Sequence, residues 1–368
     1  MRLFYLTIAL LLTFFGIAQT PVRGTWVTNV ASGALSSKEK VRETVQRCKQ
    51  HGLNTIYVVT WNKGVTMYPS PVVEKYIGIK QDPAYKGFDP IKEIIDQGHA
   101  AGLRVIGWFE FGFSYDYNDS TGVWMERYPH WAGRSNNGAV LQKNKFFWWN
   151  ALHPEVQAFM NELILDFVQR YNADGVQGDD RLPAMPGEGG YDAYTKEMYA
   201  KEHGGAAPPQ NSKDSAWTQW RADKLNLYIK NLYAQIKNLK PGYTVSWAPS
   251  IYPWSKEQYL QDWPAWLQGG YADEVLPQLY RYDITAYEKI VKELSGQLTA
   301  AQKKKVFPGI LTSLGDGYRV SSKMYLQMIA LNRKYGFTGE CNFYYEGLKD
   351  LPPVYSTGGR SSAKTKKK

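Results

Sequence analysis

Short apolar runs rich in β-branched and aromatic residues alternate with helical patterns about eight times along the chain. At several joints a glycine lies between the end of a helical pattern and the next apolar run, where a left-handed residue commonly ends a helix. These two observations predict an α/β fold, a (β/α)8 TIM barrel with long inserted loops after strands 3 and 4. An open doubly wound sheet is the alternative, but no glycine-rich phosphate loop follows the first run.

The apolar runs give the expected strands in order. The first, 23–30, reads RGTWVTNV, and the second, 54–61, reads NTIYVVTW. Their valine, isoleucine and aromatic content suits strands that are buried on both faces of a parallel sheet. Runs of similar composition follow at residues 104–111, 175–180, 244–248, 274–280, 305–310 and 339–344.

Helical periodicity between these runs predicts the crossover helices. Asp89 followed by Pro90 suits the cap and the first turn of one helix. The pairs His51-Gly52 and Ala101-Gly102 suit helix ends. We expect helices at residues 37–51, 90–101, 154–171, 215–239, 285–294 and 321–335.

Two long loops interrupt the alternation, at residues 113–152 and 181–214. Loops of this length inside a compact domain usually carry function. The first is rich in tryptophan, tyrosine and phenylalanine. We expect some of these rings to form the core of the loop itself and others to form a stacking platform for a ligand.

The N-terminus has the pattern of a secretory signal. Arg2 precedes an almost wholly apolar stretch, 3–15, and small residues follow up to Ala18. We therefore expect residues 1–18 to be a signal peptide cleaved after Ala18, which leaves a secreted or periplasmic protein without a stable membrane span. Retention of this segment as an N-terminal anchor is the alternative.

The formal net charge of +10 lies largely at the two ends. Arg2 falls in the expected signal, and five further basic residues fall in the last nine: Arg360, Lys364, Lys366, Lys367 and Lys368. We expect residues 19–350 to form one catalytic domain and residues 351–368 to form a disordered basic tail. Export and the nearly balanced body argue against a nucleic-acid partner.

The composition excludes several classes of protein. Two cysteines exclude a disulfide scaffold and a cysteine-rich zinc site, and the five histidines show no HxxH or HExxH spacing. We therefore expect no metal and no cofactor. Cys48 and Cys341 are expected to be separate buried thiols, with a disulfide between the first and last barrel units as the alternative. Oligomeric state is left open.

In a barrel of this class the chemistry lies at the carboxyl ends of the strands. These ends combine carboxylates, carboxamides and aromatic rings, a mixture that suits a polyhydroxylated ligand such as a polysaccharide or another glycan. The expected catalytic residues are Asp179, Asp180 and Glu110. The expected substrate-binding residues are Asn29, Trp61, Asn62, Trp108, Arg181, Trp247, Gln278, Tyr280, Arg281, Asn342, Tyr345 and Glu346.

The adjacent acids Asp179 and Asp180 are the most informative of these. Two carboxylates at one site cannot both ionise freely, so the pKa of one should rise, as in a glycosidase that needs an acid and a base. Glu110 follows a run that should be buried in the barrel, so it should face a ligand or bond a neighbour. A structural role for one Asp, as a cap or as a partner of Arg181, is the alternative.

From the first strand to the last, the chain resembles the glycosyl hydrolase-like 10 family of exported bacterial proteins. The matching stretches are 23–28 (RGTWVT), 54–58 (NTIYV), 68–70 (YPS), 88–90 (FDP), 100–108 (AAGLRVIGW), 108–110 (WFE) and 174–180 (DGVQGDD). The resemblance implies a glycoside hydrolase-like barrel with Asp179, Asp180 and Glu110 at its centre. It also implies a cell-envelope glycan, such as the glycan strands of peptidoglycan, as the substrate.

We expect a glycosidase in which one of Asp179 and Asp180 protonates the glycosidic oxygen. The other, or Glu110, would be the nucleophile, the general base or the group that orients a substrate acetamide. Carboxyl groups ~5 Å apart imply retention of configuration and ~6.5–9.5 Å implies inversion. A glycan-binding barrel without catalysis and a metal-assisted deacetylase or amidase are the alternatives.

Overall fold

The computed structural model describes residues 20–315 and 317–355, and in that part of the chain eight parallel strands form one sheet. Their spatial order is β11–β10–β9–β5–β2–β1–β15–β12. The strands are β1 (Arg23–Val27), β2 (Thr55–Val59), β5 (Arg104–Phe109), β9 (Gly175–Gly178), β10 (Thr244–Trp247), β11 (Glu274–Val275), β12 (Gly309–Leu311) and β15 (Glu340–Phe343).

The two edges of this sheet meet. Parallel bridges join Val275 to Val306 and Gln278 to Gly309, so the segment of β11 pairs with the segment of β12 and the sheet closes into a ring. Each predicted strand run overlaps one strand of the ring, in the predicted chain order, although β12 extends one residue past the predicted run 305–310. The prediction of a TIM barrel is therefore confirmed.

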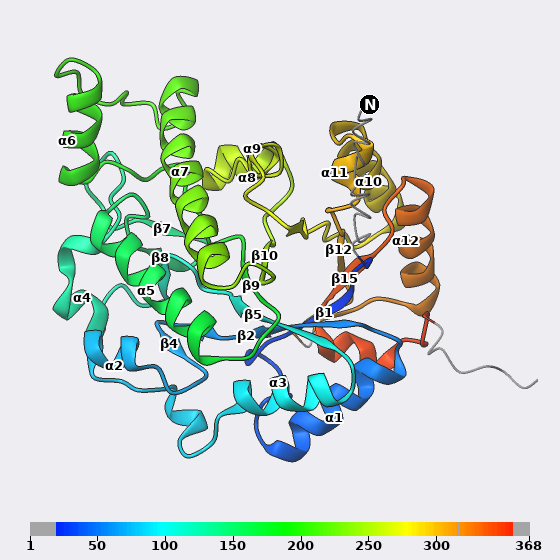
Figure 1. Cartoon of the computed structure of the whole chain (residues 1–368). Helices are drawn as coiled ribbons and strands as arrows, with labels where there is room; N and C mark the ends of the chain where they lie inside the picture. Colours follow the sequence, from blue (N-terminus) through cyan, green and yellow to red (C-terminus); the bar gives the residue numbers. More distant parts are fainter. Residues whose placement is uncertain (1–19, 316, 356–368) are drawn as a thin grey trace, which may run out of the picture.

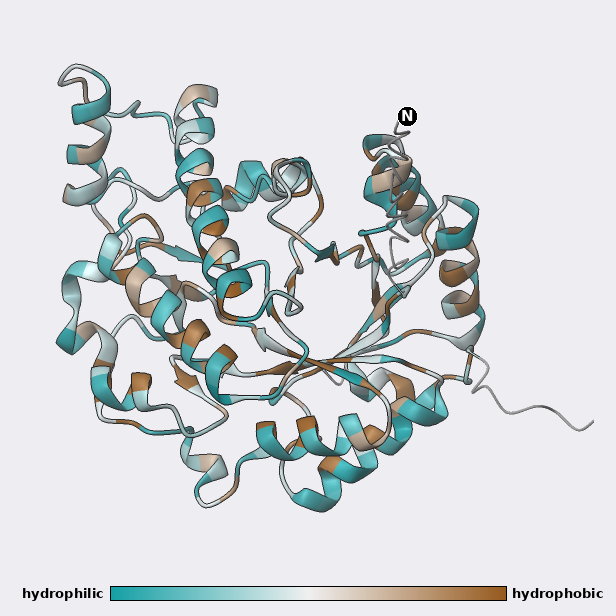
Figure 2. Ribbon diagram, viewed as in Figure 1, coloured by the Kyte–Doolittle hydropathy of each residue, from teal (hydrophilic) through white to brown (hydrophobic). Residues whose placement is uncertain are grey.

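Helices cover the outside of the ring (Figure 1). Ser37 and Asp89 cap the first two crossover helices, each through its side-chain oxygen. The helices that the sequence predicts are α1 (Lys38–Gln50), α3 (Pro90–Ala100), α5 (Pro154–Arg170), α7 (Ser215–Leu239), α10 (Ile284–Gln297) and α12 (Ser322–Lys334). Their outer faces are hydrophilic and their apolar residues turn towards the sheet (Figure 2).

Most of the short elements that the sequence did not predict lie in the loops at the carboxyl ends of the strands, whereas α11 comes between α10 and β12. The loop after β5 holds a small antiparallel sheet, and a hairpin follows β12. The additional strands are β3 (Trp61–Asn62), β4 (Val65–Thr66), β6 (Ser114–Tyr117), β7 (Gln142–Lys143), β8 (Phe146–Trp148), β13 (Ser313–Leu314) and β14 (Tyr318–Arg319). The additional helices are α2 (Pro71–Ile77), α4 (Val123–Arg127), α6 (Ala193–Glu202), α8 (Trp254–Tyr259), α9 (Trp263–Gly269) and α11 (Ala300–Lys303), with 3-10 turns at Pro83–Tyr85, Pro129–Trp131 and Tyr345–Asp350.

Several aromatic residues of the loop after β5 form a core of their own, as expected. Trp124 and Trp149 lie 5.0 Å apart edge to face, and both pack on Phe159 of α5. Trp131 completes the cluster at 6.0 Å from Trp124. These contacts attach the loop firmly to the barrel wall and leave other loop residues free to face the strand ends.

The described chain extends past the boundary expected at residue 350. Leu351 is buried, and Tyr355 donates a hydrogen bond to Glu340 and lies under the guanidinium of Arg23. Residues 351–355 therefore belong to the folded domain. The expected signal peptide at 1–18 and the rest of the expected tail, 356–368, lie outside the described residues.

Cys48 and Cys341 are both free and buried, which confirms the expectation of separate thiols. Burial raises the pKa of the Cys48 thiol to about 12. Within residues 20–315 and 317–355, no helix combines the length and the apolar composition that crossing a bilayer requires.

Candidate active site

Glu110 and Asp179 lie side by side at the carboxyl ends of two neighbouring strands. Phe109 of β5 is in register with Gly178 of β9, so the residue after each strand end is Glu110 in one case and Asp179 in the other. Both side chains point into the ring, because they continue the inward alternation of Trp108 and Gln177.

One guanidinium group lies among the three predicted catalytic carboxylates. Nη2 of Arg181 donates to Oδ2 of Asp179 at 2.8 Å and lies 3.7 Å from Oε1 of Glu110. Nη1 lies 2.9 Å from Oδ1 of Asp180. The Nε donates to the backbone oxygen of Glu110 at 2.9 Å, and the guanidinium lies 4.6 Å from the ring centre of Phe146. Arg181 therefore fixes the three acids relative to one another.

Amide and hydroxyl groups from other strand ends support the acids. Asn62 donates to Oε2 of Glu110 at 2.7 Å, and the hydroxyl of Thr28 lies 3.4 Å from the same oxygen. Gln278 donates to Oδ1 of Asp179 at 2.9 Å. Side chains from five strand ends thus converge on one place, which is the arrangement that a barrel active site requires.

Electrostatics favour a proton at this site. Burial raises the pKa of Glu110, and the positive charge of Arg181 only partly offsets this effect. Burial and then the charge of Asp180 raise the pKa of Asp179 well above its usual range, despite the ion pair with Arg181. Burial lowers the pKa of Arg181, but the surrounding carboxylates outweigh burial and keep it charged. The single positive charge of Arg181 is therefore shared by three acids. Among them, Asp179 has a pKa raised well above its usual range and is the one we expect to stay protonated.

The three acids differ in their access to solvent. The side chain of Asp179 is 4% exposed, that of Glu110 is 13% exposed and that of Asp180 is 23% exposed. Asp179 therefore lies deepest and Asp180 lies nearest to the mouth. This gradient of burial puts two acids of the same chemistry in different environments, as acid and base roles require.

Aromatic side chains form the floor and one wall of the site. Trp108 lies one layer below Glu110, 6.3 Å from Trp26, whose indole donates to Gln177. Tyr280 stacks on Phe343 at 4.9 Å, and both rings are half-buried. Burial, and next the charge of Asp179, raise the pKa of the Tyr280 hydroxyl.

Several buried polar atoms at these strand ends have no hydrogen-bond partner among the described residues. They are Oδ1 of Asn29, Oδ1 of Asn62, Nε1 of Trp108 and the hydroxyl of Tyr280. The Oδ1 atom of Asp180 also lacks an aligned hydrogen bond, although Arg181 lies close to it. Buried donors and acceptors in folded proteins are nearly always paired, so this concentration favours a polar ligand with several hydroxyl or amide groups.

The β7–β8 hairpin covers the site on the side of the fourth strand. Lys143 donates to both carboxylate oxygens of Glu188 at 3.0 Å and to the side chain of Gln258 at 2.8 Å. Asn144 donates to the hydroxyl of Tyr259 at 2.8 Å. The hairpin therefore bridges from the loop after β5 to the loop after β10, and this side of the mouth is covered.

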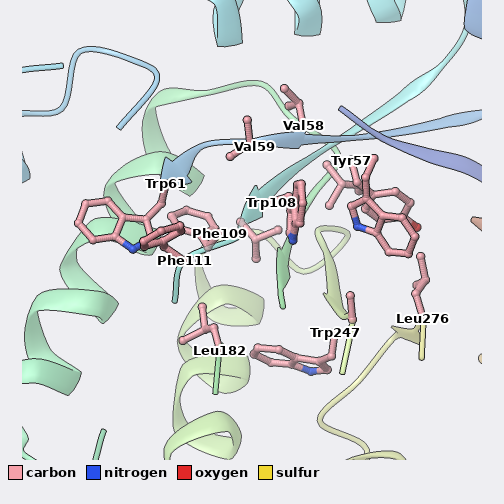
Figure 3. Packing of buried hydrophobic residues seen from close by; sticks show 14 of the residues in the cluster. Tyr57, Val58, Val59, Trp61, Trp108, Phe109, Phe111, Leu182, Trp247 and Leu276 are labelled. Carbon is pink, nitrogen blue, oxygen red and sulfur yellow. The ribbon is translucent and has the colours of Figure 1, made fainter. Parts of the chain in front are cut away.

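Two of the predicted tryptophans lie elsewhere, which corrects the expectation that they bind substrate. Trp61 is fully buried in the core of the loop, where its indole donates to the backbone oxygen of Gly112. Trp247 points outward from β10, packs on Trp266 of α9 and donates to the backbone oxygen of Tyr271. Figure 3 shows Trp61, Trp108 and Trp247 in separate parts of the buried packing. Protein atoms cover Trp61 and Trp247, and Trp108, 1% exposed, contributes a floor and no open stacking face.

The expected roles of one residue on the last strand and one residue in the turn after it also need correction. Asn342 is fully buried on β15, on the opposite face from Phe343, and donates to the backbone oxygen of Gly24. Tyr345 is buried under Arg47 of α1, outside the ring. Asn342 does not face the acids, because the side chains of a strand alternate between the inside and the outside. Tyr345 does not face them either, because the chain has left β15 and begins the 3-10 turn Tyr345–Asp350.

The remaining predicted residues lie at the edge of the site. Glu346 accepts a hydrogen bond from Ser32 at 2.8 Å and forms an ion pair with Lys349. Arg281 is half-buried and donates to the backbone oxygen of Tyr280. The sequence analysis did not name Thr28 and Phe343 as site residues. Side chains two residues apart on a strand lie on the same face, so Thr28 shares the inner face with Trp26 and Phe343 shares it with Cys341.

Among residues 20–315 and 317–355, no group of three or more His, Cys, Asp or Glu side chains has an arrangement suited to a metal ion. The three acids are organised around a guanidinium group instead. The chemistry that the described side chains offer is proton transfer, charge stabilisation and hydrogen bonding to a polar ligand.

Residues 21–327 match the family model described as glycosyl hydrolase-like 10. The chain belongs to the glycosyl hydrolase-like 10 family. It is 24% identical over 309 residues to glycosyl hydrolase DigH of Escherichia coli K12, a match that covers 72% of this chain and 65% of DigH. It is 22% identical over 381 residues to glycosyl hydrolase YngK of Bacillus subtilis, covering 90% of this chain and 68% of YngK. The chain thus spans slightly less than two thirds of DigH.

Solved structures support the same fold. The glycoside hydrolase domain of PgaB (BpsB) from Bordetella bronchiseptica superposes with a TM-score of 0.68 and 12% identity, over 90% of this chain and 95% of that domain. Alpha-L-fucosidase isoenzyme 2 from Paenibacillus thiaminolyticus gives a TM-score of 0.63 and 16% identity, over 90% of this chain and 48% of that one. At these identities the likeness is one of fold. This glycosyl hydrolase-like 10 protein therefore has a TIM barrel of the kind that glycoside hydrolases use.

Proposed function

We propose that this protein is a glycosidase that hydrolyses the O-glycosidic bonds of a polysaccharide. The observation that carries the proposal is the pairing of Glu110 and Asp179 across Arg181 at adjacent strand ends. We further propose that the substrate is a glycan of the bacterial cell envelope, with the glycan strands of peptidoglycan as the first to test. The N-terminal signal pattern, which would export the protein, supports this choice.

In the proposed reaction Asp179 is the general acid. Its pKa lies well above the usual range, so it keeps a proton at a pH where most carboxyl groups have lost theirs. That proton moves to the glycosidic oxygen as the bond to the anomeric carbon breaks. Gln278 and Arg181 hold the carboxyl group from two sides, so its orientation is fixed before the substrate arrives.

Glu110 is the carboxylate of the pair. Asn62 donates to its Oε2, and the charge of Arg181 lies 3.7 Å from its Oε1. Burial raises the pKa of Glu110, but these contacts oppose that rise and favour the ionised form. Its Oε1 and the Oδ2 of Asp179 approach the same nitrogen, at 3.7 and 2.8 Å, so the two oxygens cannot lie farther apart than the sum of these distances. Such an upper limit fits the ~5 Å of retaining glycosidases and excludes all but the short end of the ~6.5–9.5 Å spacing of inverting ones. On this ground we assign Glu110 as the nucleophile.

Asp180 has a third role in this proposal. It is the most exposed of the three acids, and its Oδ1 lacks an aligned hydrogen bond. Its place nearest the mouth suits an acceptor for a hydroxyl or amide group of the sugar.

The test is incubation of the purified protein with peptidoglycan and a panel of neutral and amino-sugar polysaccharides. Soluble products are then analysed by mass spectrometry. A hydrolase yields saccharides whose masses equal the cleaved pieces plus one water. Absence of such products from every polysaccharide would refute the proposal.

A second candidate, a glycan-binding barrel without catalysis, rests on one specific observation. Arg181 lies within ion-pair distance of all three acids, and a guanidinium that neutralises them would suppress acid–base chemistry. This candidate predicts that the protein pellets with an insoluble glycan and releases no new reducing ends. The same incubation therefore separates the two functions.

A further inference from the structure

Two tyrosine rings, one exposed and one half-buried, lie together beyond the site, on the same face of the barrel. The side chain of Tyr282 is 62% exposed and follows the sixth strand, β11, directly before the cap of α10. Tyr318 lies in the β13–β14 hairpin that follows the seventh strand, β12. Their ring centres are 5.0 Å apart at an interplanar angle of 89°. Loops that follow neighbouring parallel strands open on the same end of the barrel as Glu110 and Asp179.

This pair continues the inner wall of the site outward. Gln278 bonds Asp179, Tyr280 stacks on Phe343, and Tyr282 comes two residues later on the same segment. A chain of that length reaches at most ~14 Å from Gln278 to Tyr282. One short segment, residues 278–282, therefore carries the contact to the proposed acid at one end and the exposed tyrosine at the other.

The elements that carry the two tyrosines are held in place. Asp283, next to Tyr282, caps α10 by accepting from the backbone of Ala286. In the hairpin, Arg319 donates to the side chain of Ser313 and to the backbone oxygen of Gly315. Leu314, 48% exposed, lies directly opposite Tyr318 and widens the apolar surface. Rings fixed in this way bind a flat apolar face with little loss of entropy.

We propose that Tyr282 and Tyr318 form a distal binding subsite for sugar units of the same polysaccharide that is cleaved between Glu110 and Asp179. The inference rests on the proposed function and deepens it, because it requires a substrate with several sugar units beyond the cleaved bond. The C–H faces of a pyranose pack on aromatic rings, and the hydroxyl of the exposed Tyr282 can donate to or accept from the sugar's own hydroxyls. The β7–β8 hairpin covers the site on the side of the fourth strand, whereas the side of the sixth and seventh strands is exposed. The glycan would therefore extend from the acids towards the sixth and seventh strands.

The size of the surface argues for a glycan over a protein partner. Two tyrosines and one leucine offer far less than the ~800 Å² that each partner buries in a stable protein–protein interface. Stacked sugar units need only the area of the rings themselves. The tyrosine surface is also continuous with the aromatic wall of the proposed active site. We therefore assign to it the same polysaccharide that the active site binds.

The experiment compares Tyr282→Ala, Tyr318→Ala and the double variant with Leu326→Ala. Leu326 is 46% exposed on α12, so its change removes a similarly exposed apolar side chain outside the proposed subsite. Binding is measured by co-sedimentation with insoluble peptidoglycan and with chitin, in a Glu110→Gln background that prevents digestion. Hydrolysis is measured on the digested polysaccharide and on an aryl glycoside too short to reach the rim. Tyr282→Trp tests rescue by another aromatic ring.

We expect each tyrosine variant to bind the polysaccharide about three- to tenfold more weakly and to raise its KM by the same factor. The kcat, and the hydrolysis of the aryl glycoside, should not change, and Tyr282→Trp should restore binding. If the double variant binds and cleaves the polysaccharide as well as Leu326→Ala does, the proposal of a distal subsite is refuted, while the proposal of glycosidase activity is not. If the wild-type protein neither binds nor cleaves any glycan, the proposed function fails and the subsite fails with it.

Discussion

The side-chain amide of Gln278 donates to Asp179 at 2.9 Å, which ties the end of the sixth strand to the acid of the fourth. A donor at this position stabilises the ionised carboxylate, so its removal should raise the pKa of Asp179 further. Since Asp179 must be protonated to act as the general acid, Gln278→Ala should extend activity to higher pH, by up to ~1 pH unit for one hydrogen bond. The measurement is the pH profile of kcat. An alkaline limb that stays in place would contradict the role given to Asp179.

The proton on Asp179 also predicts how activity depends on the leaving group. Asp179→Asn cannot donate that proton, so aryl glycosides with basic, poor leaving groups should lose the most rate. Those with acidic phenols need little assistance and should lose the least. The measurement is kcat for a series of aryl glycosides of graded phenol pKa. A loss equal for all of them would assign Asp179 to binding.

Ionising Asp179 should reduce the stability of the folded protein. Its pKa is 3.8 in an ordinary environment and lies well above that value in the folded protein. Below the ordinary value both states carry the proton, and folding stability is lost as the pH rises through the folded value. Asp179→Asn, which never ionises, should therefore melt close to the wild-type protein at pH 4 and above it at pH 8. Thermal unfolding at the two pH values measures this, and equal differences at both would contradict it.

Arg181 should matter for both folding and activity. Its removal leaves three neighbouring carboxyl groups without a cation, and breaking a buried pair costs about 3–5 kcal/mol. Arg181→Met should lower the melting temperature and abolish most activity. Arg181→Lys keeps the positive charge but loses the several donors of the guanidinium, so its melting temperature and activity should lie between those of Arg181→Met and the wild-type protein. Arg42→Met, at an exposed arginine of α1, is the control. Equal melting temperatures for the Arg181 and Arg42 variants would remove Arg181 from the centre of the site.

Lys143 should hold the β7–β8 hairpin over the site. Its side chain is 15% exposed and contacts Glu188 and Gln258. Lys143→Met keeps the apolar stem and loses these contacts, so the hairpin should open more often and trypsin should cleave faster after Lys145. Lys201→Met on α6, where the lysine is 73% exposed, is the control. Mass spectrometry of the digest gives the rates, and an unchanged rate at Lys145 would show that other contacts hold the hairpin.

The fold could be predicted from the sequence because it depends on local patterns. Each strand run, such as 104–111, is apolar enough to be buried on both faces, and a capped helix follows it. The rule that chemistry lies at the carboxyl ends of barrel strands also predicts that Glu110, Asp179 and Gln278 lie at one edge of the sheet. Loop elements such as β7 and β8 were not predicted, because their two or three residues carry too weak a pattern.

The direction of each side chain was harder to predict than its position along the chain. Trp247 ends β10 and Asn342 comes one residue before the end of β15, but the alternation turns both side chains away from the inside of the ring. Trp61 leaves the alternation entirely, because the chain bends into β3 after Thr60. The place of Arg181 among three acids depends on how the chain turns after β9, and composition holds no information on that turn.

The central claim is that Glu110 and Asp179 are the catalytic pair of a glycosidase. The most direct measurement is the initial rate of reducing-end release from the digested polysaccharide by the wild-type protein, Glu110→Gln, Asp179→Asn and the control Asp96→Asn, whose carboxylate is 58% exposed on α3. We expect Glu110→Gln and Asp179→Asn each to lose at least ~100-fold in kcat while they still melt cooperatively, and Asp96→Asn to match the wild-type protein. Rates within a few fold of wild type for both site variants would show that Glu110 and Asp179 are not the catalytic pair.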